Sequence, residues 1–360
     1  MRSDMASAQT RLIRFEDLKD FCRRAYEAAG VLAGEAAIVA ELLARADLRG
    51  VASHGVMRLP IYIERLEKDY VRKKCQLTTL RQKGATAFLQ AHGSMGHVVS
   101  QRAMRLAMEL AQTHGIGWVT VKDSGHFGVT GLFPMMALEE DLIGYVCSNS
   151  APMMAPFGGK SRIMGNNPLS YAFPADQRLP VVVDFSCTVV ASGRLILARK
   201  KGESIPLGWA VDKDGHPTSD PFAGYEGGGS LAPVGRHKGY GLALAHEILS
   251  AVLGGGKWTQ SIKSLYEKDD SGIQGTCHSF LALDPDCFVG RAEFKQAMDQ
   301  YIETVKDSGT AEGVAEIFLP GEIEARTEER CLVQGVPLAE ATAQDLEALA
   351  VRLGLRLRFA

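Results

Sequence analysis

The chain of 360 residues is longer than one hydrophobic core usually supports, because single cores tend to divide beyond roughly 250–300 residues. Its 46% hydrophobic and 23% charged residues are typical of a globular protein and exclude a disordered chain or a fibre. A net charge of −2 argues against a nucleic-acid-binding protein, since a phosphate-binding surface needs an overall basic bias. We therefore expect two lobes with a cleft between them, where small-molecule chemistry usually takes place.

The seven cysteines are odd in number, widely spread along the chain and form no CxxC pair. This distribution predicts free thiols in a reducing cytoplasm rather than a disulfide framework or a zinc site. The first 25 residues carry charges throughout, and no stretch reaches about 18 uninterrupted apolar residues. We therefore expect a soluble cytoplasmic protein without a signal peptide or a membrane span.

The first third of the chain shows the three- and four-residue apolar spacing of helices. The residues between the third and fourth of these helices predict strands, and helical patterns return near the C-terminus. We expect the early helices to form one lobe. The predicted helices cover residues 15–29, 34–48, 60–70 and 97–113.

From residue 116 onward, short apolar runs alternate with helical patterns. Strands are predicted over residues 116–122, 143–149 and 179–186, with helices over 132–141 and from about Gly239 to Gly254. Such alternation indicates an α/β layer structure. The three strands are followed by polar residues that we expect to line one edge of the sheet, namely His126, Ser148 to Ser150, and Asp184 to Ser186.

The segment RADLRGVASHGVMRLPIYIERL places Ser53 and His54 in the gap between two helices. Proline is tolerated in the first turn of a helix, so a helix that begins near Arg58 puts Arg58 and Tyr62 one turn apart on the same face. A guanidinium binds a carboxylate with two hydrogen bonds, and a phenol can donate a third. His54 then offers a group of near-neutral pKa for the proton transfer that alcohol oxidation requires. The alternative is an ordinary turn in which His54 caps a helix and Arg58 forms a salt bridge.

Two further segments combine polar residues with glycines. The stretch DSGHFGVTG places His126 just past a strand, where glycines let a ligand approach the backbone, although a histidine in such a turn is more often structural. In GRHKG, His237 and Lys238 directly precede a helix, where free N–H groups and a lysine suit a pyrophosphate. The alternative is a solvated basic turn.

Asp184 ends a strongly apolar strand, where its carboxylate could accept hydrogen bonds from a ribose or cap the next element. The GxGxxG fingerprint of dinucleotide-binding loops is absent. His246 and Glu247 lack the second histidine of an HExxH motif, so we predict no metal there. Ser53 beside His54 does not indicate a hydrolase, because adjacent side chains rarely aim at each other and there is no GxSxG elbow.

Taken together, these segments resemble the malate/L-lactate dehydrogenase family of the second type. This family also contains ureidoglycolate, sulfolactate and 2,3-diketogulonate oxidoreductases and piperideine-2-carboxylate reductases. The matching stretches run in family order over most of the chain. They are DLRGVASHGVMRLPIYIERL, GHFGVTG, APFGG, MGNNPLSYAFP, DFS, SIPLGWAVDKDGHPTSDP, HKGYGLAL and LPGE.

The resemblance implies an α/β fold that is not a Rossmann fold, and a homodimer with the active site between the lobes. Residues 1–115 plus 318–360 are expected to form a helical substrate and dimerisation lobe, and residues 116–317 a nicotinamide-binding α/β domain. The implied cofactor is NAD, with NADP as the alternative. The implied reaction is hydride transfer between this cofactor and C2 of a small 2-hydroxy acid or keto acid, such as malate, lactate or ureidoglycolate.

The resemblance also implies roles for single residues. His54, supported by Ser53, is a proton donor or acceptor, and Arg58 and Tyr62 hold the substrate carboxylate. Some members use the histidine that matches His126 instead, so the choice between the two histidines stays open. The implied cofactor-binding residues are Ser150, Asn166, Asp184, Phe185, Ser186, His237, Lys238, Pro320, Gly321 and Glu322.

Two other functions remain as alternatives at this point. One is an NADPH-dependent reductase of cyclic imino acids, of the piperideine-2-carboxylate type. The other is a non-catalytic relative that keeps the fold and binds a ligand without turnover.

Overall fold

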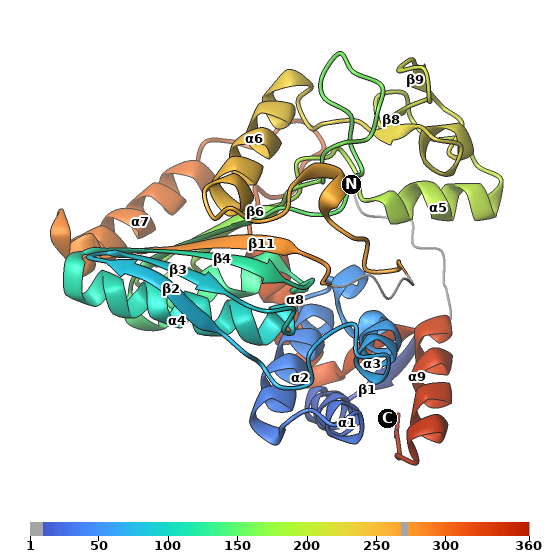
Figure 1. The fold of residues 1–360 in the computed structure, drawn as a ribbon. Helices are drawn as coiled ribbons and strands as arrows, with labels where there is room; N and C mark the ends of the chain where they lie inside the picture. Colours follow the sequence, from blue (N-terminus) through green and yellow to red (C-terminus); the bar gives the residue numbers. More distant parts are fainter. Residues whose placement is uncertain (1–9, 268–272, 360) are drawn as a thin grey trace.

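A seven-stranded sheet runs through the centre of the protein, whose computed structural model describes residues 10–267 and 273–359 (Figure 1). The strands lie side by side in the order β2-β3-β4-β11-β5-β6-β7. β3 and β4 are parallel, and every other neighbouring pair of this sheet is antiparallel. The strands are β2 (Thr78–Lys83), β3 (Thr86–Gln90), β4 (Ile116–Ser124), β5 (Ile143–Ser148), β6 (Leu169–Phe173), β7 (Val181–Phe185) and β11 (Thr276–Leu283).

Helices cover both faces of this sheet, and the predicted α/β class is confirmed (Figure 1). α4 (Gly96–His114) lies on one face, whereas α6 (His237–Glu247) and the π-helical turn Ile248–Val252 that extends it lie on the other. α4 packs closely on β4 because Gly117 has no side chain: a Cβ there would lie 2.0 Å from the carbonyl oxygen of Ala107.

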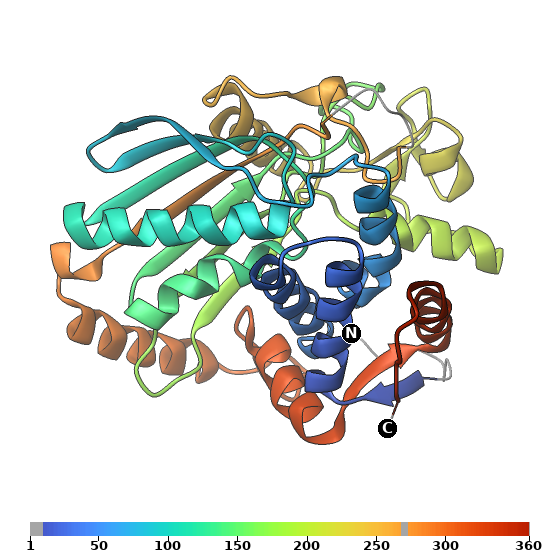
Figure 2. The ribbon, with the colours of Figure 1, turned by 60° about the horizontal axis from the view of Figure 1, so that its bottom comes forward.

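The N- and C-terminal parts of the chain meet in a group of helices beside the sheet (Figure 2). β1 (Thr10–Ile13) pairs antiparallel with β12 (Val336–Ala339), which ties the two parts together. The helices predicted in the first third of the chain are confirmed to within a few residues. The helices of this group are α1 (Phe15–Ala28), α2 (Ala33–Leu48), α3 (Leu59–Glu67), α8 (Glu322–Gln334) and α9 (Glu340–Leu353).

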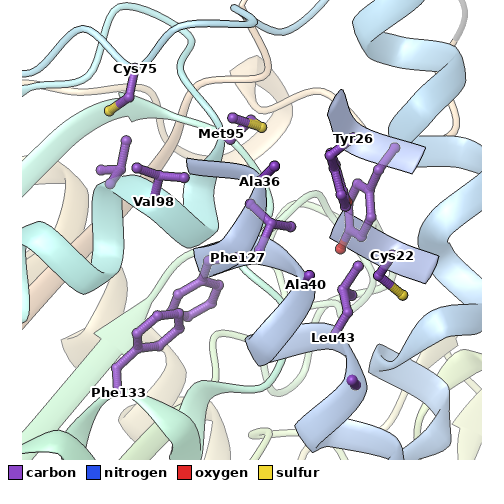
Figure 3. Close-up of a cluster of buried hydrophobic side chains, with 14 of the residues drawn as sticks. Cys22, Tyr26, Ala36, Ala40, Leu43, Cys75, Met95, Val98, Phe127 and Phe133 are labelled. Atoms are coloured by element: carbon purple, nitrogen blue, oxygen red, sulfur yellow. The ribbon is translucent and has the colours of Figure 1, made fainter. Parts of the chain in front are cut away.

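One continuous hydrophobic core joins this helical group to the sheet (Figure 3). Ala36, Ala40 and Leu43 of α2 belong to the same buried cluster as Phe127 and Phe133, whose rings stack with centroids 5.1 Å apart. The two alanines allow α2 to lie deep between its neighbours. Because protein cores are close-packed, residues between α2 and the end of β4 sit in fixed surroundings.

β2, β3 and α4 precede residue 116, where the α/β domain was predicted to start, yet they pair with and pack on the large sheet. A second sheet of three short strands, in the order β10-β8-β9, lies with α5 at one side of the molecule (Figure 1). The remaining elements are α5 (Ser192–Lys201), β8 (Ala210–Val211), β9 (Pro217–Thr218), β10 (Ser230–Leu231) and α7 (Arg291–Lys306).

The helix predicted over residues 132–141 is present, but as 3-10 winding and not as an α-helix. The chain forms 3-10 turns at Thr130–Leu132 and Pro134–Glu140. Gly144 of β5 comes so near that a Cβ there would lie 2.3 Å from the carbonyl oxygen of Pro134, and Gly131 donates its N–H to Asp184 of β7. These contacts with two strands hold the segment in a tighter winding than its apolar spacing predicts.

All seven cysteines are free thiols, as predicted, and every one except Cys287 is buried. Burial raises the pKa of several of these thiols, so they are held in the unreactive protonated form. Within residues 10–267 and 273–359, no helix is both long enough and apolar enough to cross a membrane.

β4, β5 and β7 run in the same direction, because a single antiparallel strand separates each from the next. β11 lies between β4 and β5, and β6 lies between β5 and β7. Their C-terminal ends therefore lie at one edge of the sheet, which confirms the prediction made from the polar residues that follow them. The segments described next lie at this edge.

Candidate active site

The segment that carries Ser53 and His54 is held by a buried carboxylate. Asp47, near the end of α2, accepts a hydrogen bond from the N–H of Val56 at 2.6 Å. Gly55 makes this approach possible, since a Cβ there would lie 1.9 Å from Oδ2 of Asp47. Burial raises the pKa of Asp47 to about 7. Two 3-10 turns, Ala52–His54 and Val56–Arg58, follow from this anchoring and lead into α3.

The structure brings this segment to the histidine after β4. The rings of His54 and His126 stack, with centroids 5.7 Å apart and an interplanar angle of 15°. Oγ of Ser53 lies 2.9 Å from Nδ1 of His54, and Nε of Arg58 donates to the carbonyl oxygen of Ser53 at 2.9 Å. His54 and His126, the two candidates for the proton donor or acceptor, are therefore neighbours.

Tyr62 faces His126. Its buried hydroxyl lies 2.6 Å from Nδ1 of His126, and its ring meets the edge of the His97 ring at a centroid distance of 5.2 Å. The N–H of Gly128 also points at Nδ1 of His126, at 3.3 Å. The N–H of His126 itself donates to Oε1 of Gln274 at 2.9 Å. This hydrogen-bonded frame fixes both the backbone and the ring of His126.

Arg58 is half-buried and forms no ion pair with a carboxylate of the described residues, so the salt bridge of the alternative interpretation is absent there. Its guanidinium lies 5.3 Å from the ring centroid of Tyr266. Nε is engaged by the backbone of Ser53, which leaves the two Nη groups for a ligand. A planar guanidinium with two free Nη groups can bind a carboxylate through paired hydrogen bonds.

Burial keeps the histidines of this region neutral. It lowers the pKa of His54 to about 4, with a contribution from the positive charge of Arg58, and that of His97 to about 3. The pKa of His126 is lowered well below its ordinary value for the same reason. His278 of β11 has a pKa lowered to about 3, and its Nδ1 lies 2.9 Å from Oγ of Ser148. Neutral imidazoles can accept a proton from an alcohol or donate a hydrogen bond to a carbonyl.

Ser150 and Asn166 lie together just past the end of β5. Oγ of Ser150 donates to Oδ1 of Asn166 at 2.7 Å and accepts from the N–H of Asn166 at 3.1 Å. The carbonyl oxygen of Asn166 accepts from the N–H of Cys187, directly after Ser186. The GNNP segment thus joins the ends of β5 and β7. Nδ2 of Asn167 continues the link by donating to the carbonyl oxygen of Ala243 in α6 at 2.9 Å.

Asp184 and Phe185 present exposed side chains at the end of β7. Oδ2 of Asp184 accepts from the N–H of Gly131 at 3.0 Å, which draws the GHFGVTG segment over this strand. Its other carboxylate oxygen has no hydrogen-bond partner among residues 10–267 and 273–359. Burial raises the pKa of Asp184 to about 6. An unpaired carboxylate oxygen at a strand end is a suitable acceptor for ligand hydroxyls.

The LPGE segment is attached to β7 from the other side. The N–H of Val182 donates to the carbonyl oxygen of Pro320 at 2.9 Å. Gly321 has a φ of 88°, and a Cβ there would lie 2.8 Å from Cβ of Val182. The buried carboxylate of Glu322 pairs with Lys306 and Arg326 and accepts from the N–H of Leu319. Glu322 therefore holds the loop in place, and its carboxylate is already engaged.

His237 and Lys238 are exposed in the first turn of α6. The preceding Val234 donates its N–H to the carbonyl oxygen of Cys187, so this helix start is tied to the end of β7. The His237 ring meets that of Phe157 at a centroid distance of 5.9 Å. The structure thus places Ser150, Asn166, Asp184 to Ser186, His237 and Lys238 along one edge, whereas Pro320–Glu322 lie beside β7 near Val182.

Sequence reasoning missed His97, Gln274, Tyr266 and the anchoring role of Asp47. None of them belongs to a sequence motif that indicates a catalytic or binding role. His97, Tyr266 and Gln274 reach the site only because elements far apart in the chain pack together. Among the described residues, no group of three or more His, Cys, Asp or Glu side chains is arranged to hold a metal ion.

The chain belongs to the malate/L-lactate dehydrogenase family, whose model matches residues 13–347. It is 36% identical to the malate dehydrogenase of Pyrococcus horikoshii over 345 residues, which cover 94% of each chain. It is 33% identical to the ureidoglycolate dehydrogenase (NAD(+)) of Escherichia coli O157:H7 over 319 residues, 88% of this chain and 90% of the relative.

Solved structures agree with this membership. The sulfolactate dehydrogenase of Methanocaldococcus jannaschii superimposes with a TM-score of 0.89 at 35% identity, covering 96% of this chain and 98% of the other. The agreement extends over nearly the whole length, so the sheet and the helical group of this chain both have counterparts there.

The buried histidines make stability depend on pH. The pKa of His97 is lower in the folded state than in the unfolded state. As the pH falls below about 6.5, the unfolded chain therefore binds a proton that the folded chain does not bind. The folded state loses stability until the pH reaches about 3. We expect His97→Gln to remove this loss. Relative to wild type, its free energy of unfolding should rise by about 2 kcal/mol between pH 7.5 and pH 5 in urea titrations.

The matched control for His97→Gln is His114→Gln, at the exposed other end of α4. This variant should follow the wild-type pH profile. A His97→Gln profile parallel to that of wild type would show that burial does not keep His97 neutral.

Proposed function

We propose that the protein catalyses reversible hydride transfer between a nicotinamide dinucleotide and C2 of a small 2-hydroxy acid or the corresponding keto acid. The observation that carries this proposal is the meeting of Arg58, His54 and His126 beside the strand ends. A free guanidinium and two neutral imidazoles are the groups that a 2-hydroxy acid needs for binding and proton transfer. Family members named malate, sulfolactate and ureidoglycolate dehydrogenase support this substrate class.

Each group has a defined task in this reaction. The Nη groups of Arg58 bind the carboxylate with two parallel hydrogen bonds, which fixes C2 and its oxygen in front of the histidines. In the oxidation direction, C2 loses a hydride, and a histidine takes the hydroxyl proton as the carbonyl forms. Bound carboxylate also neutralises Arg58, which removes one of the two causes that lower the pKa of His54.

The strand-end edge fits a dinucleotide. Asp184 offers a carboxylate oxygen for ribose hydroxyls. Lys238 offers a positive charge for a pyrophosphate, whereas the N–H groups of Lys238, Gly239 and Tyr240 already donate to the carbonyl oxygens of Gly235, Val234 and Arg236. Phe185, which is 38% exposed, offers an apolar surface beside them. Ser150, Asn166, Ser186 and His237 border the same edge, and the Pro320–Glu322 loop lies beside β7 at Val182. When bound, the nicotinamide supplies or accepts the hydride.

We propose NAD as the cofactor, with NADP as the alternative. Relatives carry either in their names, as in the (2R)-3-sulfolactate dehydrogenase (NADP(+)) of Chromohalobacter salexigens. The dinucleotide would lie on a largely antiparallel sheet, without a Rossmann fold, between the α/β domain and the helical lobe. The free cysteines fit a reducing compartment, so we place the enzyme in the cytoplasm.

We also propose a homodimer, supported by an apolar stripe on the outer face of α6 and its extension. Leu244, Ile248 and Val252 follow one another at four-residue spacing and are 42%, 47% and 50% exposed. The neighbouring Leu253 is 62% exposed. Exposed apolar patches of this kind mark interaction surfaces, and a second copy of the chain would cover this one.

Cofactor titration and substrate assays test the proposed reaction. The purified chain should bind NADH or NADPH and oxidise at least one of malate, lactate, sulfolactate and ureidoglycolate, with reduction of the matching keto acid. Failure to bind either dinucleotide would contradict the proposal. Turnover of piperideine-2-carboxylate alone would favour the imine reductase, and dinucleotide binding without any turnover would favour the non-catalytic relative.

Arg58→Lys should weaken substrate binding, because an ammonium keeps the charge and loses the bidentate geometry. We expect KM for the acid to rise about tenfold or more, with a smaller change in kcat and unchanged NADH affinity. Arg105→Lys, at an exposed position of α4, is the control and should leave both constants unchanged. An unchanged KM in Arg58→Lys would remove Arg58 from the carboxylate site.

Light scattering tests the dimer. Wild type should show twice the mass of the chain, and the double variant Ile248→Glu/Val252→Glu should show the mass of one chain, because charges in the stripe oppose its burial. Leu332→Glu, at a 58% exposed position of α8, should remain dimeric. A monomeric wild type at micromolar concentration would contradict the dimer.

A further inference from the structure

The hydrogen bonds at Nδ1 of His126 define which nitrogen of the ring carries the proton. The N–H of Gly128 points at this nitrogen from 3.3 Å, and a backbone N–H can only donate. Nδ1 must then be an acceptor, so the hydroxyl of Tyr62, 2.6 Å away, donates to it as well. A neutral imidazole with Nδ1 as acceptor carries its proton on Nε2.

The surroundings maintain this arrangement. The N–H of His126 donates to Oε1 of Gln274, and the His97 ring packs edge-on against Tyr62. Only glycine fits at position 128, since a Cβ there would lie 2.8 Å from Nε2 of His97. Burial raises the pKa of Tyr62 and lowers that of His126, so the donor keeps its proton and the acceptor stays neutral.

His54 differs from His126 in this respect. Its Nδ1 lies 2.9 Å from Oγ of Ser53, and a serine hydroxyl can either donate or accept. The exposed Ser53 side chain can rotate to suit either state of the ring. His54 can therefore gain a proton on either nitrogen without leaving two donors facing each other, whereas His126 cannot carry a proton on Nδ1.

We propose that Tyr62 is a positioning residue which, with the Gly128 amide, fixes His126 as the Nε2–H tautomer. His126 then donates a hydrogen bond to the C2 oxygen, and His54 takes or gives its proton. In oxidation, the hydride leaves C2 for the nicotinamide, the hydroxyl proton passes to His54, and His126 keeps its own proton throughout. The catalytic assignment rests on the proposed function, whereas the tautomer is a property of the protein alone.

Nuclear magnetic resonance of the full chain, labelled with ¹⁵N in its histidine rings and free of ligands, tests the tautomer directly. Long-range ¹H–¹⁵N spectra at neutral pH should show His126 with an unprotonated Nδ1 and a protonated Nε2, its signals being identified by their loss in His126→Gln. Tyr62→Phe removes one of the two donors and should give a mixture of tautomers. A wild-type ring protonated on Nδ1 would overturn the proposal.

Kinetics separate positioning from direct substrate binding. Tyr62→Phe should lower kcat by about tenfold with less than a twofold change in KM for the acid. Tyr26→Phe is the matched control, because Tyr26 and Tyr62 line the same small pocket and the buried hydroxyl of Tyr26 has no partner among the described residues. This control should behave as wild type. A raised KM with unchanged kcat in Tyr62→Phe would show that Tyr62 binds the carboxylate, and would overturn the proposal.

The two histidines give a second comparison. His126→Gln keeps an N–H donor near the position of Nε2 and should lose about tenfold in kcat, whereas His54→Ala should lose about a hundredfold or more. The acid limb of the pH profile of oxidation should disappear in His54→Ala and persist in His126→Gln. The opposite pattern would overturn the assignment. Absence of all turnover would contradict the proposed function and leave the tautomer to be judged by the spectra.

Discussion

The hydrogen bond between the buried carboxylate of Asp47 and the N–H of Val56 holds the segment that carries His54 and Arg58 in place. Gly55 must lack a side chain for this contact to form, and the two 3-10 turns on either side of it direct His54 and Arg58 outward from α2. This anchor sets the conformation of the turn between α2 and α3, and buried Val56 and Leu59 join the turn to the common core. The stacking of His54 on His126 and the free Nη groups of Arg58 both follow from this arrangement.

The site is built where two differently constructed parts of the molecule share one core. The sheet supplies an edge at which three strands end together, and the helical group supplies the guanidinium and one histidine. Their common hydrophobic cluster excludes water behind the histidines, which lowers their pKa values. Hydrogen bonds from polar groups to a reacting oxygen are strongest where the surrounding residues are apolar.

The helices of the first third and the three strands that end in polar residues could be predicted because their apolar periodicity is local and strong. β11, the central strand of the sheet, could not, since TCHSFLAL carries a buried histidine and a buried serine on a strand enclosed by neighbours. The helix over residues 132–141 could be predicted, but its 3-10 winding could not, because contacts with two strands determine it. Tyr62 was assigned from its spacing to Arg58, whereas the structure shows it hydrogen-bonded to His126.

The sequence by itself determined the α/β class, the free thiols and the shared edge of the strand ends, and it proposed most of the candidate site residues, because these depend on local patterns and on motifs. Only the tertiary structure decided that His54 and His126 stack, that Tyr62 and Gly128 meet on one nitrogen, and that Gln274 and His97 complete the frame. Hydrogen-bond geometry between residues far apart in the chain arises from packing, and no spacing rule along the sequence encodes which nitrogen of a ring becomes the acceptor.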